Sequence, residues 1–504
     1  MQLVDELRST RHWPDEPALQ VQNQRPGAHE PELVESAAGH GASVPSGRIC
    51  PLSGIWWAIL SQMSDPGLSA QERGEELLEE AKEIAELVRS QARRPFVLEL
   101  AGTPKAGKST QLGVLHDFLK QAGFEVSVMK ERAADCPIAM KGHFFFNVWT
   151  STTMLAQVLA NLDTRAELLL LDRGFFDSLV WLELQYKRGQ VSNEEKEIFE
   201  QFMLLKRWRK LTDHTVLLTA DPEEAMRREN VGRLIRREGS IMKPRELSNY
   251  NDLLEQVRAR HSESFEVTQL DTTTSQGPLQ TGIELLEELL PRLRTWADPQ
   301  ILAVPTTAVS DAFGDEQVLS VEASRAFLDR SSGGFVVHNR SSLERDDEQV
   351  QLVAAVAFRY EGDFLLFERA PDDPKKERFG TYTLWHRCHV RAQEGQATVD
   401  AARAQLRDRI LEDLHLSDIG DLHHIGALWS EKEDESNHVG LAFVVDIEHV
   451  ETAESLMAKK FRRGKRAPLL KTKFYTLQEL RKWVTEGKKL ETWSKSAAMG
   501  EMLE

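Results

Sequence analysis

The segment 102–110 (GTPKAGKST) constrains the fold of this chain more than any other part of the sequence. It fits the pattern G-x4-G-K-[ST] and lies between an apolar run at 96–101 and a helical stretch. Its glycines let the backbone wrap closely around a phosphate, and the amides at the start of the helix attract negative charge. In such a loop Lys108 reaches the β- and γ-phosphates and Ser109 holds Mg²⁺. The residues expected at the donor nucleotide are Gly102, Lys105, Ala106, Gly107, Lys108, Ser109 and Thr110.

Short apolar, β-rich runs alternate with amphipathic helical stretches around this loop. The runs lie at 96–101, 125–129, 168–172, 215–219 and 265–270. Strands that alternate with helices form a parallel sheet covered on both faces, and ligands bind at the carboxyl ends of such strands. Asp172 follows a run of four leucines. A carboxylate at the end of such a strand commonly holds Mg²⁺ together with the Ser or Thr of the loop. The pattern predicts an α/β domain with a five-stranded parallel sheet that binds ATP and Mg²⁺.

The charge of the chain limits its expected partners. The 504 residues carry a formal net charge of −17, so the chain repels a phosphate backbone and we expect no polymeric nucleic acid partner. No apolar window is long enough to span a bilayer, which predicts a cytoplasmic protein without a membrane partner. The three cysteines, Cys50, Cys136 and Cys388, form no CxxC pair, so we expect neither a disulfide framework nor a cysteine-rich zinc site. The oligomeric state stays open, with a homodimer as one option.

Composition and periodicity divide the chain into four parts. Residues 1–62 have no helical or strand period and are interpreted as disordered, or as a stretch upstream of a true start at Met63. A helix is expected within 63–94, and the α/β domain covers 95–296. After a Pro-containing connector, 297–504 shows a hairpin pattern, a long helix and further strands, which predicts a separate α+β domain.

Two further segments of the α/β domain resemble the thymidylate kinase and deoxynucleoside kinase group of P-loop enzymes. DRGFFDS at 172–178 is similar to the DR-x-x-x-S segment of that group, and MKERAADCP at 129–137 to its stretch with an acidic residue and a proline. The resemblance implies that Arg173 holds the acceptor's phosphate or steadies the transferring group. It places Glu131 near the acceptor, as a general base or as a partner of Arg173. Gly174 departs from thymidylate kinases, which usually have a large aromatic residue there.

The arginine-rich stretch at 226–242 resembles the lid that nucleotide kinases close over the phosphates. Its arginines are expected to neutralise charge on the transferred group. Arg233 and Arg237 lie four residues apart and share one helix face. The alternative is an exposed charged helix whose arginines pair with neighbouring glutamates. The other candidates in this stretch are Arg227, Arg228 and Arg236.

The acceptor is expected to contact the segment KGHFFFNVWT at 141–150. Acceptor bases are usually gripped by aromatic rings and amides, which makes Phe145, Asn147 and Trp149 candidates, with a plain core role as the alternative. We expect phosphoryl transfer to a (deoxy)nucleoside monophosphate or a nucleoside. Two alternatives stay open: a kinase with a non-nucleotide acceptor, and an ATP-hydrolysing, nucleotide-sensing switch that gates the second domain or a partner protein.

The second domain resembles the Nudix fold through its hairpin, its long helix and its closing LETWS segment. The family's box, G-x5-E-x7-RE-U-x-EE-x-G-U, falls on 394–416, with Asp408-Arg409 in place of Arg-Glu and Glu412-Asp413 in place of Glu-Glu. The resemblance implies some capacity for Mg²⁺ at Asp408, Glu412 and Asp413. Two interpretations stay open: a divergent hydrolase of a nucleoside diphosphate derivative, and a domain that binds a nucleotide without cleaving it or only scaffolds. We favour the second.

Overall fold

All described residues lie within the compact unit Ser64–Glu504. The prediction for 1–62 therefore lies outside them. No helix in the described part is long and apolar enough to cross a membrane. The computed structural model describes residues 67–91, 94–138, 142–162, 164–231, 241–274, 277–369, 382–391, 399–414, 416, 419–430, 437–458 and 469–504.

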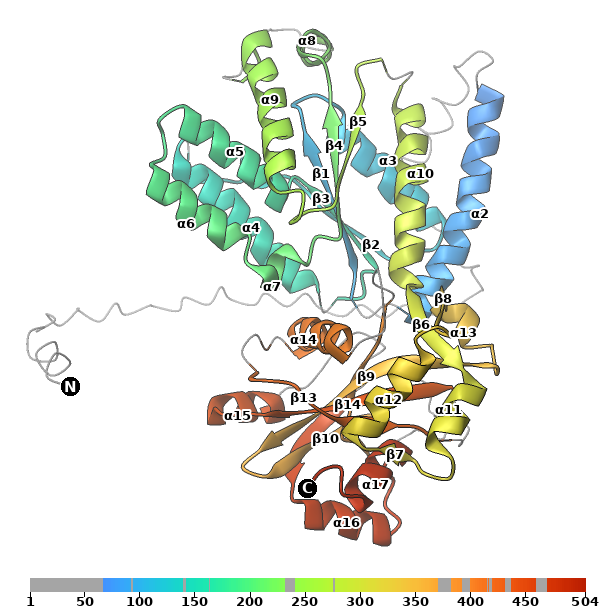
Figure 1. Ribbon diagram of the computed structural model, residues 1–504. Coiled ribbons are helices and arrows are strands. Elements are labelled where there is room, and N and C mark those ends of the chain that lie inside the picture. Colours follow the sequence, from blue (N-terminus) through green and yellow to red (C-terminus); the bar gives the residue numbers. More distant parts are fainter. Residues whose placement is uncertain are drawn as a thin grey trace, which may run out of the picture. The chain divides into compact units, whose positions relative to one another are not determined.

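The first sheet is parallel throughout and has the strand order β2-β3-β1-β4-β5 (Figure 1). All five predicted runs form strands, with ends that differ from the prediction by up to two residues. The α/β class of this part of the chain is confirmed. The strands are β1 (Phe96–Gly102), β2 (Val126–Met129), β3 (Leu168–Asp172), β4 (His214–Thr219) and β5 (Val267–Asp271).

Helices cover both faces of this sheet, because its central strands are apolar on both sides. Leu98 and Leu100 of β1 join one core with α2 (Gly67–Gln91), α3 (Lys108–Gln121) and α10 (Pro278–Ala297). The alternate residues Val97 and Ala101 join the opposite core, with α4, α5, α6 and α9. These are α4 (Phe144–Asn161), α5 (Phe175–Lys187), α6 (Asn193–Met203) and α9 (Pro244–Arg260); the shorter helices are η2 (Arg132–Ala134), α7 (Lys206–Arg209) and α8 (Pro222–Asn230).

The second sheet is mixed. Its main path runs β11-β10-β9-β14-β13-β7, and β9 (Gln349–Tyr360) is parallel to β14 (His438–Asp446). The predicted hairpin joins β9 to β10 (Asp363–Arg369) through Glu361 and Gly362, both with positive φ. The other strands are β6 (Gln300–Pro305), β7 (Val318–Leu319), β8 (Val336–Asn339), β11 (Tyr382–Thr383), β12 (His386–His389), β13 (His423–Leu428) and β15 (Leu469–Tyr475).

Helix α14 (Val399–Leu414) is the long helix that the sequence predicts, and it packs on one face of this second sheet. Trp493 of α17 (Thr492–Met499) packs on the other face, where a Cβ at Gly440 would lie 2.6 Å from its ring. The α+β class of this part is confirmed, whereas the boundary between 95–296 and 297–504 stays a prediction. The other helices are α11 (Thr306–Phe313), α12 (Val321–Ser331), α13 (Arg340–Leu343), α15 (Val450–Ala458) and α16 (Leu477–Thr485).

Candidate active site

The phosphate-binding loop connects the end of β1 to the start of α3. Its backbone enters the left-handed region three times, at Gly102 (φ 120°), Lys105 (φ 66°) and Gly107 (φ 98°). A Cβ at Gly102 would lie 2.1 Å from the carbonyl oxygen of Leu218 on the neighbouring strand, so only glycine fits there. Helix α3 then begins at Lys108, and the N–H groups of its first turn are free of partners within the helix, which is the arrangement that an anion-binding helix end requires.

Polar side chains behind the loop fix its position. The buried Thr103 hydroxyl donates to Asn251 Oδ1 (2.6 Å), and Asn251 Nδ2 donates to the carbonyl oxygen of Ala220 after β4 (3.0 Å). The buried Thr272 hydroxyl, after β5, contacts the carbonyl oxygen of Ala106 (3.1 Å). These bonds tie the loop to the ends of two strands that lie far away in the sequence.

Lys108 is buried against the loop. Its Nζ donates to the carbonyl oxygens of Gly102 (3.0 Å) and Thr103 (2.8 Å). Burial, and then repulsion by the Arg173 guanidinium, lower the pKa of Lys108 to about 7. A phosphate in the loop would favour the charged ammonium, because an opposite charge nearby stabilises it.

Ser109 and Asp172 lie side by side where the strands end. The Ser109 hydroxyl donates to Asp172 Oδ2 at 2.8 Å, and the Asp172 side chain is buried at the end of β3. Both side chains offer oxygen atoms, which are the ligands that Mg²⁺ prefers. The residues present therefore fit the metal ion that the sequence predicts.

Arg173 lies between two carboxylates. It has a φ of 65°, and its Nη1 contacts the two oxygens of Asp177 at 2.8 and 2.9 Å, while Nε lies 3.2 Å from Glu131 Oε1. Burial lowers the pKa of Arg173, but the charges of Asp177 and Glu131, with the hydrogen bond to Asp177, together outweigh burial and raise this pKa well above its usual value. The guanidinium therefore stays a cation. Of the two roles that the sequence predicts for Glu131, the contact with Arg173 is present in the structure.

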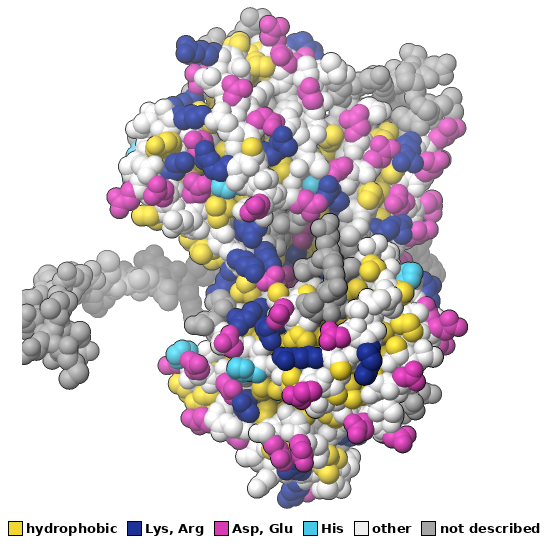
Figure 2. Space-filling model, in the orientation of Figure 1, with side chains coloured by type: hydrophobic (Ala, Val, Ile, Leu, Met, Phe, Trp, Pro, Cys, Tyr) yellow, Lys and Arg dark blue, Asp and Glu magenta, His cyan; other side chains and the backbone are white. Residues whose placement is uncertain are grey.

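This arginine–carboxylate pair differs from the surface pairs of the molecule. Acidic and basic side chains are interspersed over the visible face (Figure 2), and exposed pairs of that kind add little to stability. The Asp177 side chain is only 3% exposed, and it also accepts hydrogen bonds from Tyr250 (3.1 Å) and Trp181 (2.9 Å). Asp177 thus holds Arg173 in one orientation.

Glu99, like Asp177, is a residue that the sequence analysis did not predict. It is fully buried on β1, and its carboxylate accepts backbone N–H bonds from Gly174 (2.8 Å), Phe176 (3.1 Å) and Asp177 (2.9 Å). These donors belong to the first turn of α5, whose N–H groups have no partner within the helix. Burial raises the pKa of Glu99 to about 7.

Sequence signals existed for two of the three missed residues. Glu99 is a lone carboxylate in the apolar run FVLELA, and Asp177 follows Arg173 by four residues at the start of a helix. Tyr250 gives no such signal, because α9 meets α5 only in the folded chain.

The predicted acceptor residues do not all converge. Asn147 is buried and its Nδ2 donates to the carbonyl oxygen of Ser178 (3.2 Å), so it ties α4 to α5. Phe145 is 63% exposed, and Trp149 lies four residues further along the same helix. Residues four apart share a helix face, whereas a residue between them points elsewhere. Phe145 and Trp149 therefore remain candidates for the acceptor, and Asn147 has a structural partner instead.

The predicted lid lies mostly outside the described residues, which include neither Arg233, Arg236 nor Arg237. Arg227 pairs with Glu224 of its own helix (2.6 Å). Arg228 donates to the Thr272 hydroxyl (2.9 Å) and to the carbonyl oxygen of Lys105 (3.4 Å). Arg228 is thus the described arginine of this stretch that contacts the phosphate-binding loop.

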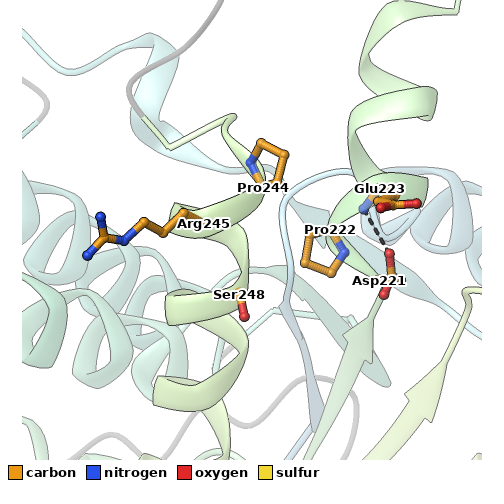
Figure 3. Close-up of a pocket in the computed structure, with 6 residues that line it drawn as sticks. All are labelled: Asp221, Pro222, Glu223, Pro244, Arg245 and Ser248. Carbon is orange, nitrogen blue, oxygen red and sulfur yellow. Dashed lines mark hydrogen bonds between the residues drawn. The ribbon is translucent and has the colours of Figure 1, made fainter.

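A separate cavity of about 610 Å³ opens between the start of α8 and the start of α9 (Figure 3). Asp221 caps α8 by accepting from the N–H of Glu223 (2.8 Å), and the Arg245 side chain points away from both. No predicted site residue is among its described lining residues, so we give it no role in the chemistry. The described lining residues are Asp221, Pro222, Glu223, Pro244, Arg245 and Ser248.

The predicted metal ligands of the second domain are paired with basic side chains. Asp408 contacts Lys206 and Lys210. Asp413 Oδ2 lies 2.8 Å from Arg409 Nε, and Glu412 Oε2 lies 3.4 Å from Arg409 Nη1. In the described part of the chain, no group of three or more His, Cys, Asp or Glu side chains is placed to hold a metal ion. The residues present therefore do not fit the Mg²⁺ that the Nudix resemblance implies.

Comparison with known proteins gives similar folds only. No protein-family model and no curated protein matches the chain. Similar solved structures include Tm1382, a candidate Nudix hydrolase, with 23% identity and a TM-score of 0.28 over 40% of this chain and 96% of that one. Deoxyadenosine kinase from M. mycoides gives 19% identity and a TM-score of 0.30, over 39% of this chain and 99% of the form with bound dCTP or 100% of the form with bound dATP. Likenesses of this size support no conclusion about activity.

The topology itself decides the fold. A loop of the G-x4-G-K-[ST] type follows β1 of a parallel β2-β3-β1-β4-β5 sheet, and a mixed sheet with α14 on one face follows it in the chain. The chain combines a P-loop kinase-like fold with a Nudix-like fold. Both parts of the resemblance stated from the sequence are therefore present.

Proposed function

We propose that the chain is a kinase that uses Mg²⁺ and transfers the γ-phosphoryl group of ATP to a nucleoside or a (deoxy)nucleoside monophosphate. The observation that carries the proposal is the meeting of three strand ends at one place. Ser109 after β1 contacts Asp172 of β3 at 2.8 Å, and Glu131 after β2 lies 3.2 Å from Arg173. A phosphate cradle, an oxygen pair for a metal ion and a cation–carboxylate pair are the parts that phosphoryl transfer requires.

The residues of the loop would hold the donor. Lys108 exchanges its two carbonyl partners for the β- and γ-phosphates, and the N–H groups at the start of α3 bind the phosphate oxygens. Ser109 and Asp172 would hold Mg²⁺, which when bound offsets the negative charge of the phosphates. Arg173, oriented by Asp177, stabilises charge on the transferred group. The lid arginines Arg233 and Arg237 stay proposed for the same task.

Glu131 is the proposed base. Its exposed carboxylate lies beside Arg173, with which it forms an ion pair through Oε1. A base must lie within hydrogen-bonding reach of the proton that it takes, and the position after β2 places Glu131 at the carboxyl edge of the sheet.

The charge around Arg173 favours a nucleoside over a nucleoside monophosphate. Asp177 and Glu131 both contact the guanidinium already, so one cation faces two anions. The phosphate of a monophosphate acceptor would add a further negative charge and compete with these carboxylates. A nucleoside accepts the phosphoryl group on a neutral hydroxyl and adds no negative charge.

The test is ATP consumption against a panel of nucleosides and nucleoside monophosphates, with products resolved by mass. Lys108→Ala is the inactive variant, and Lys120→Ala, an exposed lysine on the same helix, is the matched control. A phosphorylated product that Lys108→Ala loses and Lys120→Ala keeps establishes the kinase. ATP hydrolysis without any phosphorylated acceptor would contradict it and favour the nucleotide-sensing switch.

A further inference from the structure

The acidic group on α14 contains its own cation. Arg409, Glu412 and Asp413 stand at positions i, i+3 and i+4, so their side chains share one side of the helix. The Arg409 guanidinium lies 2.8 Å from Asp413 and 3.4 Å from Glu412. The side chains of Arg409 and Asp413 are 19% and 11% exposed, which shields their pairing from solvent.

A second basic side chain approaches the same carboxylate. His386 of β12 is buried, and its Nε2 lies 3.6 Å from Asp413 Oδ2. Asp413 of α14 thus lies near Arg409 of its own helix and near His386 of the sheet. The Asp413 carboxylate therefore takes part in the packing of α14 against β12.

A divalent cation bound here would lie too close to the guanidinium. Mg²⁺ binds carboxylate oxygens at about 2 Å and requires several oxygen ligands in fixed directions. Arg409 already approaches both carboxylates, and its guanidinium is a cation. Two positive charges a few ångströms apart in a partly buried place repel strongly.

We propose that Arg409 takes the place of a divalent cation in the Nudix-like domain. The domain then folds, and binds any ligand, without a metal ion on α14, and it does not hydrolyse a diphosphate through a metal ion held there. The Arg409 guanidinium, a positive charge that belongs to the chain, replaces a metal ion that could exchange with the solvent. This inference is independent of the kinase activity proposed above.

Mn²⁺ binding to the full chain, followed by electron paramagnetic resonance, tests it. All proteins carry Asp172→Asn, so that the proposed metal site of the kinase domain is weakened equally in each. The parent should take up no Mn²⁺ on α14. Arg409→Glu places a third carboxylate beside Glu412 and Asp413, and it should gain one bound Mn²⁺ per chain that the parent lacks. Adding Asp413→Asn should abolish the gain.

Arg407→Glu is the matched control for the change of charge. Arg407 lies on the same helix but contacts the carbonyl oxygen of Gly420 and the exposed Asp421. It should gain no Mn²⁺ site. Equal Mn²⁺ uptake in both charge-reversed variants would overturn the inference, because only general charge would then be responsible.

Two measurements do not depend on how well Arg409→Glu folds. Mn²⁺ in place of EDTA should raise the thermal midpoint of Arg409→Gln by more than it raises the midpoint of the parent, because the carboxylates of this variant have lost their cation. A Mn²⁺ site in the parent that Asp413→Asn removes would overturn the proposal outright.

Discussion

Glu99 and Gly174 determine each other's positions. The Gly174 N–H donates to Glu99 Oε1 at 2.8 Å, and a Cβ at residue 174 would lie 2.8 Å from the carboxyl group of Glu99. The glycine is therefore required by a buried carboxylate on the neighbouring strand. This gives a physical reason for the absence of the large aromatic residue that thymidylate kinases usually have there. It also fixes the turn that presents Asp172 and Arg173.

Gly174→Ala should destabilise the kinase domain by about 1–3 kcal/mol, the usual cost of overpacking a buried site. It should also lower the rate of phosphoryl transfer, because Glu99 must move and the turn at Asp172 and Arg173 moves with it. Gly113→Ala is the control: this glycine lies inside α3 and a Cβ added there would have no atom within 4 Å, so alanine should stabilise by about 0.5–1 kcal/mol. Denaturant unfolding and transfer rates of both variants check this, and equal effects would contradict it.

Glu99→Gln should change how stability depends on pH. Burial raises the pKa of Glu99 from 4.5 to about 7, so between these values the folded chain binds a proton that the unfolded chain has released. The stability that this group contributes is present below pH 4.5 and is lost as the pH rises through 7. The free energy of unfolding of the parent should fall by about 2 kcal/mol relative to Glu99→Gln between pH 5.5 and 7.5.

Denaturant unfolding of both proteins at the two pH values measures this difference. A difference between parent and Glu99→Gln that stays constant with pH would show that Glu99 titrates at its ordinary pKa. Transfer rates at pH 7.5 should also fall in Glu99→Gln, since an amide accepts fewer of the three N–H bonds.

Lys108→Ala should lower the transfer rate by roughly a hundredfold or more without lowering stability. The folded chain without nucleotide holds this ammonium in a buried place that lowers its pKa to about 7, so its removal takes away an unfavourable charge. Thermal unfolding without nucleotide should give a midpoint at or above that of Lys120→Ala. A large loss of stability would mean that the two carbonyl contacts of Lys108 hold the loop together.

Glu131→Gln and Asp177→Asn should separate chemistry from positioning. Glu131 is exposed, so its variant should lose roughly 10²- to 10⁴-fold in transfer rate while the free energy of unfolding changes by less than about 0.5 kcal/mol. Asp177 is buried beneath Arg173, Tyr250 and Trp181, so its variant should lose about 3 kcal/mol or more of stability. Nucleotide binding, unfolding and single-turnover rates measured on both variants distinguish the two outcomes. Unchanged transfer in Glu131→Gln would remove it as the base.

The fold of each part could be predicted from the sequence, and the residues proposed to bind the donor nucleotide come from the same source. The run of strands and helices predicts a parallel sheet because each central strand is apolar on both faces, and the G-x4-G-K-[ST] loop needs only its own glycines to form. Ser109 was predicted from the loop motif and Asp172 from its place at the end of an apolar strand, whereas Glu131 was implied by the resemblance to the kinase group. Strand ends in a parallel sheet meet at one edge, which is why the three lie together. These features depend on neighbours in the chain or on a general rule of topology.

Which charges meet depends on packing between segments that are distant in the sequence. Glu99 of β1 accepts hydrogen bonds from the start of α5, and Tyr250 of α9 contacts Asp177 of α5. His386 of β12 approaches Asp413 of α14. The resemblance to the Nudix box implied a metal ion at Asp413, and Arg409 changes that assignment by lying 2.8 Å away. Contacts of this kind depend on how helices pack onto sheets, which no local pattern in the sequence specifies. Buried charges interact strongly only at the short distances that this packing creates.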